Sequence, residues 1–193
     1  MLRVSQRELS RPDADPLWRS AVVLGAAAQG QFDLAREQLL ITSPELFEPR
    51  PVISARPAND AIGGAYVIGK AGDAGQARRV ALGVLAATEP QPGMRQMNAR
   101  RVARTKAFVL LGDNERAIAE LQAAYDAGYR EVYDLDSFMR LDAYPGMASL
   151  RDDPRFRAII ARIEADNNRQ KQALLQGGSA GPPPPQKVAD RAA

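Results

Sequence analysis

A pattern of seven residues occurs three times in this chain without gaps, at residues 30–36, 72–78 and 112–118. Each copy begins with a glycine and has an alanine five residues later; the glycines are Gly30, Gly72 and Gly112, and the alanines are Ala35, Ala77 and Ala117. Glycine permits the tight backbone turn that ends one helix. The small alanine lets the next helix approach the first one closely. The pattern therefore predicts pairs of neighbouring helices joined by tight turns.

The amino-acid composition favours packed helices over sheets. Apolar residues make up 45% of the 193 residues, aromatic residues only 6%, and alanine, the residue with the best helix propensity, is abundant. We therefore expect an all-α fold. Capping residues, prolines and glycines predict helices over about residues 16–30, 33–41, 60–72, 73–85, 95–111 and 114–127, and from 153 onward.

Three local expectations accompany these helices. Ser43, followed by a proline, predicts a short helical turn that contains Leu46 and Phe47. Asn59 or Asp60 is expected to cap the helix that follows the proline-rich connection. Asp136 is expected to cap a short helix in the less regular stretch after Gly128; its apolar residues are Phe138, Met139 and Leu141.

The three repeats resemble the tetratricopeptide repeat, a helix–turn–helix unit with glycine and alanine at the same spacing. The glycines here are 42 and 40 residues apart, whereas the period of the family is about 34 residues. The family's small residue in the first helix is kept as Ala65 but replaced by Val23 and Thr105. The resemblance covers residues 16–128 and implies a right-handed α-solenoid of about three degenerate helix pairs.

The segments on either side of the repeat region have expected roles as well. Residues 1–15 are interpreted as a polar leader, residues 16–176 as the helical domain and residues 177–193 as a disordered tail rich in glycine and proline. Asp153 is expected to begin a C-terminal capping helix, whose apolar face is Phe156, Ile159, Ile160 and Ile163. The phrase at residues 150–156 resembles the end of repeat regions in bacterial signalling and winged-helix transcription regulators, which implies a regulatory role.

Several chemistries are excluded or disfavoured by composition. The chain has no cysteine and no histidine, which removes disulfides, thiolate metal sites and the commonest general base. We therefore expect no enzyme activity, no metal and no cofactor. No run of about 18 apolar residues occurs, so we expect no membrane span. In the absence of an export signal we expect a cytoplasmic protein, or a periplasmic one if the chain belongs to a larger membrane-anchored regulator.

The resemblance also implies a binding surface, because the first helix of each tetratricopeptide pair lines a concave groove. Carried over by register, the groove positions of this chain are Asn59, Ile62, Tyr66, Val102, Lys106 and Val109. A groove with an amide, a phenol and an ammonium group suits an extended peptide or a chain terminus. The preferred interpretation is therefore a protein-interaction or sensor module that binds a peptide or protein partner.

Two alternatives belong to other functional classes. A basic stretch could contact DNA in a transcription-control system, or could instead pair with acids of the next segment such as Glu115 and Glu120; its arginines are Arg95, Arg100, Arg101 and Arg104. The stretch lacks interleaved aromatic residues, which disfavours nucleic acid. The second alternative is an enzyme, and an ATPase is the only version with a partial motif. The segment from Gly64 to Ala71 nearly matches a phosphate-binding loop, but it lacks the final hydroxyl and lies within a predicted helix.

Overall fold

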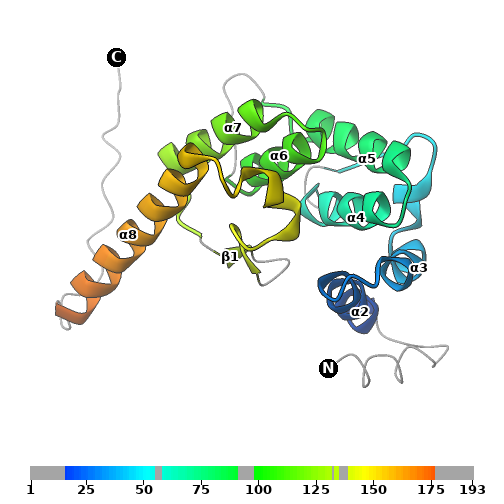
Figure 1. Cartoon of the computed structure of the whole chain (residues 1–193), viewed down its shortest axis with the longest axis horizontal. Helices are drawn as coiled ribbons and strands as arrows, with labels where there is room; N and C mark the ends of the chain where they lie inside the picture. The colour runs from blue at the N-terminus through cyan, green and yellow to red at the C-terminus, as the bar shows by residue number, and fades with distance from the viewer. Residues whose placement is uncertain (1–15, 55–57, 91–97, 132, 135–138, 177–193) are drawn as a thin grey trace, which may run out of the picture.

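The computed structural model describes residues 16–54, 58–90, 98–131, 133–134 and 139–176 (Figure 1). Within these residues the fold is helical, apart from one antiparallel pair of two-residue strands. The elements are α2 (Pro16–Ala28), α3 (Phe32–Thr42), the 3₁₀ helix η1 (Pro44–Phe47), α4 (Ala58–Lys70), α5 (Ala74–Ala87), α6 (Asn98–Leu110), α7 (Asn114–Asp126), β1 (Tyr133–Asp134), β2 (Met139–Arg140), the 3₁₀ helix η2 (Pro145–Leu150) and α8 (Pro154–Gln176). The predicted leader and tail, as well as Arg95, lie outside the described residues.

The three repeated glycines form the turns that the sequence predicts. They have positive φ angles of 72°, 99° and 80° at Gly30, Gly72 and Gly112, a conformation that residues with a side chain adopt at a cost. In each turn the amide after the glycine donates to a carbonyl five residues earlier: Gln31 to Ala26 at 2.9 Å, Asp73 to Ile68 at 3.1 Å and Asp113 to Phe108 at 2.8 Å. These bonds satisfy carbonyls that the helix end leaves without partners.

The helices joined by these turns pack against each other, α2 on α3, α4 on α5 and α6 on α7. The repeated alanines Ala35, Ala77 and Ala117 are all buried, as the close approach of the paired helices requires. Contacts of α3 with α4, and of α5 with α6, connect one pair to the next (Figure 1). The expected pairing of sequence neighbours is therefore confirmed.

The helix starts predicted near residues 73 and 114 are confirmed as well. The side chain of Asp73 accepts a hydrogen bond from the amide of Gln76 at 2.8 Å, and that of Asp113 from the amide of Arg116 at 3.1 Å. Each bond satisfies a donor at a helix N-terminus that has no partner within the helix.

Two local expectations are wrong. Asn59 and Asp60 do not cap α4, because the helix already begins at Ala58 and both residues lie within its first turn. The short helix expected around Met139 is absent: β2 pairs with β1 there, with Tyr133 opposite Arg140. Besides the pairing of β2 with β1, this segment contacts α8, since the Arg140 guanidinium lies 2.6 Å from Glu164. Asp136 and Phe138 lie outside the described residues.

The core has two clusters that share α6. The first contains apolar residues of α2 to α5 and, from α6, Ala103 and Ala107. The second contains Val102 and Phe108 of α6 with apolar residues of α7, η2 and α8. Because adjacent residues of one helix contribute to both clusters, α6 joins the two halves of the molecule.

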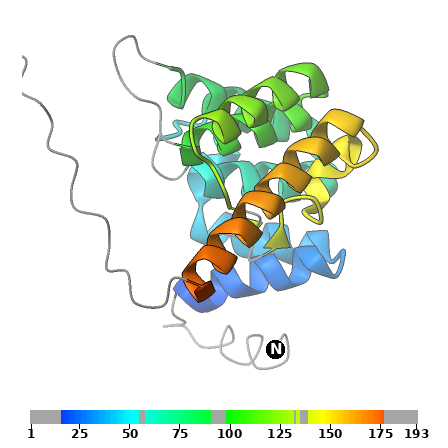
Figure 2. The same ribbon diagram turned by 90° about the vertical axis from the view of Figure 1, so that its left-hand side faces the viewer.

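The C-terminal helix α8 buries apolar side chains only in its first half. The predicted apolar face is buried in the second cluster; it consists of Phe156, Ile159, Ile160 and Ile163. After Ile163 no described residue of α8 is buried, and Leu174 and Leu175 are 77% and 74% exposed. The C-terminal half of α8 extends beyond the other described helices in Figure 1, and in Figure 2, seen from that side, α8 crosses in front of them. No described helix combines the length and the apolar character needed to cross a bilayer.

Candidate functional site

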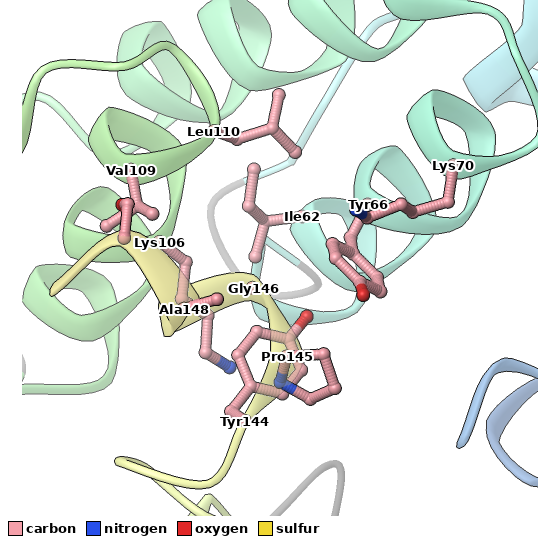
Figure 3. A pocket seen from close by; sticks show the side chains of 11 residues that line it. Ile62, Tyr66, Lys70, Lys106, Val109, Leu110, Tyr144, Pro145, Gly146 and Ala148 are labelled. Carbon is pink, nitrogen blue, oxygen red and sulfur yellow. The ribbon is translucent and has the colours of Figure 1, made fainter. Parts of the chain in front are cut away.

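A cleft of about 210 Å³ lies between α4, α6 and the segment Tyr144–Ser149 (Figure 3). Ile62, Tyr66 and Lys70 form the α4 wall, because residues four apart share one face of a helix. The α6 wall is formed in the same way by Lys106, Val109 and Leu110. The third wall comes from the chain segment that includes η2. This segment folds back onto α4 and α6, the first helices of the second and third pairs.

Lys106 is the buried cation of this cleft, with only 4% of its surface exposed. Its ammonium Nζ donates a hydrogen bond to Asn59 Oδ1 at 2.8 Å and lies 5.0 Å from the centre of the Tyr144 ring. A cation over an aromatic face is attracted by the negative charge density of the ring. Asn59 and Tyr144 thus fix a positive charge in the lining of the cleft.

Tyr66 of the cleft packs against two other aromatic rings. Its ring lies 6.0 Å from that of Phe32 in an edge-to-face arrangement and 6.0 Å from that of Tyr144 at a tilt of 47°. Lys70 Nζ lies 5.8 Å from the Tyr66 ring centre. Burial raises the pKa of the Tyr66 hydroxyl, and the charge of Arg151 opposes part of this rise. The hydroxyl therefore stays protonated near neutral pH and can donate a hydrogen bond.

The third wall is held firmly against the core. Met147 and Leu150 of η2 are fully buried, and Tyr144 is nearly so. A Cβ added at Gly146 would lie 2.5 Å from Cε1 of the Tyr144 ring, so a side chain at this position requires the ring to move. The wall is thus a packed part of the fold, shaped around Tyr144.

The described lining of the cleft carries positive charge. None of the eleven described residues that line it is acidic, whereas Lys70 and Lys106 contribute ammonium groups from two helices. The other lining side chains are aromatic, aliphatic or small. The described residues contain no group of three or more acidic side chains placed to hold a metal ion. Such an arrangement suits an anionic group attached to an apolar one.

The structure brings five of the six predicted groove residues together. Ile62, Tyr66, Lys106 and Val109 line the cleft, and Asn59 holds Lys106. Val102 does not line the cleft. Val102 is 3% exposed and belongs to the second core cluster, because the returning C-terminal segment packs on this part of α6.

Several cleft residues were missed by sequence reasoning. Lys70 is on the correct face of α4, four residues after Tyr66, so the helical spacing alone could have found it. The segment Tyr144–Ser149 is different: its sequence predicts only a turn, and no local pattern shows which helices it contacts.

Two arginines of the basic stretch form ion pairs within the protein. Arg104 Nε donates to Glu120 of α7 at 2.7 Å, and the Arg101 guanidinium lies 3.6 Å from the same carboxylate. Arg104 also donates to the carbonyl of Leu85 at 3.1 Å. Arg101 and Arg104 therefore pair with an acid of the next helix. The sequence offers this pairing as the alternative to DNA contact. Arg100 is partly exposed.

The segment that resembles a phosphate-binding loop lies in α4, except for its last residue, Ala71. A Cβ at Gly64 would lie 2.6 Å from Cδ1 of Leu46 and 3.3 Å from Cδ2 of Leu39. Close packing of α4 against these leucines accounts for Gly64, and the loop conformation that a nucleotide requires is not formed.

Comparison of the chain with protein-family models, with curated proteins and with solved structures finds no match. A function is therefore inferred from the residues that line the cleft.

Proposed function

We propose that this protein is a non-catalytic interaction module that binds a peptide or protein partner in the cleft between α4, α6 and η2. One observation carries this proposal. Residues selected only by their register in two separate first helices, Tyr66 and Lys106 among them, line a single cleft. This convergence supports a binding surface of the tetratricopeptide kind.

We also propose that the helix pairs are degenerate tetratricopeptide-like units stacked as a right-handed solenoid. The shared turn geometry at Gly30, Gly72 and Gly112 supports this arrangement. So does the contact between α4 and α6, the first helices of consecutive pairs. The segment after Gly128 then closes the concave side and places α8 at the end of the stack.

Binding without catalysis is favoured by the chemistry of the polar groups at the cleft. A general base works best with a pKa near the operating pH, whereas burial moves the pKa of Tyr66 upward, away from that range. The ammonium of Lys106 is held by Asn59 and the Tyr144 ring. A fixed cation of this kind can hold an anionic ligand without reacting with it.

The proposal is tested by site-specific crosslinking in a lysate of the cells from which the protein comes. A photoreactive benzoylphenylalanine replaces Ala148, an exposed residue at the rim of the cleft. We expect one discrete adduct that disappears in a Lys70→Glu background, because the reversed charge repels an anionic ligand. The matched control, Lys171→Glu on the exposed end of α8, should leave the adduct unchanged. Equal loss in both backgrounds, or no adduct at all, would contradict the proposal.

A part in transcription control is compatible with the same cleft when the partner is itself a regulator. Direct DNA contact through the basic stretch is less well supported, since Arg101 and Arg104 are already paired with Glu120. An arginine in an intramolecular ion pair must break that pair before it can neutralise a phosphate.

A further inference from the structure

We propose that a second cavity of the molecule binds a small phosphate monoester that carries hydroxyl groups, such as a sugar phosphate. The cavity lies between α8 and the chain on either side of η2, and it shares no described lining residue with the cleft. We call it the arginine pocket; the charged side chains of its described lining are Arg140, Asp142, Arg151, Arg157 and Glu164. The proposal goes beyond the partner-binding function and concerns a separate site.

The arginine pocket has the size of a small-molecule site. It measures about 340 Å³, within the roughly 300–1,000 Å³ of pockets for small ligands. Phe156 and Ile160 also line it, but they are packed in the second core cluster and are only 1% and 5% exposed. Contact with a ligand therefore falls mainly to the charged side chains, which lie on a packed part of the fold.

Arg140 pairs with both acids of the described lining. Its Nη2 lies 2.9 Å from Oδ2 of Asp142 and 2.6 Å from Oε1 of Glu164. Its Nε also donates to Asp142, at 3.0 Å. These three side chains together carry a single negative charge, so the other two arginines of the lining keep their positive charges for a ligand.

Arg151 is fixed in place by groups that carry no net charge. Its Nε donates to the carbonyl of Asp142 at 2.9 Å, and its Nη2 donates to the carbonyls of Ala143 at 2.9 Å and Tyr144 at 3.4 Å. Among the described residues no acceptor contacts Nη1, which leaves two N–H donors of the guanidinium for a ligand. A side chain that is already held in position loses little conformational freedom when it binds.

Arg157 supplies the second positive charge. It is exposed on α8, and its contact within the described part of the chain is a long hydrogen bond of 3.4 Å to the carbonyl of Asp152. Like Arg151, it forms no ion pair with a described acid. A phosphate monoester carries a charge of about −1.5 to −2 near neutral pH, which matches two guanidinium groups. Guanidinium groups also fit phosphate oxygens with two parallel hydrogen bonds.

Glu164 gives the pocket an acceptor for hydroxyl groups. It lies seven residues after Arg157, on the same face of α8 and about 10 Å farther along the helix. Oε1 of Glu164 accepts from Arg140, whereas Oε2 has no partner among the described residues. A sugar phosphate has its negative charge at one end and hydroxyl donors along the rest of the molecule, so it can contact both the arginines and Glu164. Inorganic phosphate can contact only the arginines.

Isothermal titration calorimetry with the full-length protein tests the proposal. The ligands are pentose and hexose monophosphates, each matched with the free sugar, the sulfate ester of the same sugar and inorganic phosphate. A pool of phosphoserine pentapeptides presents the same phosphate group on a polypeptide. We expect at least one sugar phosphate to bind. Its sulfate ester has a single negative charge and should bind about tenfold more weakly or worse, because charge-assisted hydrogen bonds weaken with the charge of the acceptor.

Matched variants test whether the ligand lies in the arginine pocket. Arg157→Gln should weaken binding of the sugar phosphate by about tenfold or more, because hydrogen bonds to a charged group are lost. Arg78→Gln, the same change at an exposed position of α5, should leave binding unchanged. Arg151→Lys keeps the charge without the planar guanidinium and should also weaken binding. Circular dichroism verifies the fold, and Arg157→Gln decides alone if the Arg151 variant fails to fold.

The other outcomes overturn the proposal. If no sugar phosphate binds, or if the sulfate esters bind as tightly, the cavity is not a site for phosphate monoesters. Inorganic phosphate that binds as tightly as the sugar phosphates would show that no hydroxyl group is recognised. Phosphoserine peptides that bind while the sugar phosphates do not would make the ligand a modified protein. Equal binding by the wild type and the folded arginine variants would place the ligand elsewhere.

Discussion

At the scale of single residues, two adjacent glycines of α4 have different surroundings. A Cβ at Gly63 meets nothing within 4 Å, whereas a Cβ at Gly64 would lie 2.6 Å from the buried side chain of Leu46. Gly63→Ala should therefore stabilise the protein by about 0.5–1 kcal/mol through helix propensity. Gly64→Ala should be roughly 1–3 kcal/mol less stable than Gly63→Ala, since overpacking opposes that gain. Urea unfolding of both variants measures the difference, and equal midpoints would show that Leu46 moves without cost.

Single residues also show how much of the cleft can be predicted from the sequence. Tyr66 and Lys106 could be placed because a helical register, once the turn glycines fix it, determines which residues share a face. Val102 has the correct register but the wrong environment, because the chain segment that covers it starts more than 30 residues later in the sequence. Tyr144 could not be assigned to the cleft for the same reason: its position depends on long-range packing.

At the scale of elements, one helix start differs from its two counterparts. Gln31 has φ and ψ of −85° and 64°, close to the −100° and 72° of Asp73, but its side chain makes no capping hydrogen bond. Gln31→Asp should therefore add a cap to α3 and stabilise the protein by about 0.5–2 kcal/mol. Thermal unfolding measures the gain. Gln31→Glu supplies the same charge on a longer side chain and should stabilise less; an equal gain would indicate a charge effect and no cap.

The start of α8 makes a prediction about pH. The side chain of Arg155 and backbone amides hydrogen-bond Asp153 and lower the pKa of its carboxyl from 3.8 to about 2. The ionised form is thus favoured in the folded state, so its contribution to stability is present above pH 3.8 and disappears as the pH falls toward 2.

Asp153→Asn keeps the capping geometry but removes the charge. The variant should be less stable than the wild type near neutral pH, and the difference should shrink between pH 3.8 and about 2. Denaturant unfolding of both proteins over this range provides the measurement. A difference that stays constant with pH would mean that the charge of Asp153 contributes nothing.

Elements with local signals are also those that the sequence predicts. The paired helices have a glycine for the turn, and two of them have an aspartate cap, so their ends are determined within a few residues of chain. β2 and η2 have no comparable signals. Their conformations depend on partners distant in sequence, such as Glu164 for Arg140 and α6 for η2.

At the scale of the whole molecule, the sharing of α6 between the two core clusters predicts a single unfolding transition. Phe156→Ala removes a buried ring from the second cluster and should cost about 3–5 kcal/mol, whereas Ile68→Ala in the first should cost about 2–5 kcal/mol. Both variants should lower one common melting temperature in calorimetry. Two transitions, of which each variant shifts only one, would show that the halves unfold independently.

The position of Tyr144 has a consequence for communication across the molecule. Its ring faces the cleft and also belongs to the cluster that seats the first half of α8. If undocking of the helix displaces this ring, a ligand that favours its present position also favours the docked helix, and thermodynamic reciprocity then requires a loosened helix to weaken ligand binding by the same factor. Ligand binding in the cleft would then slow amide hydrogen exchange along α8, at the far side of the protein from the first helix pair.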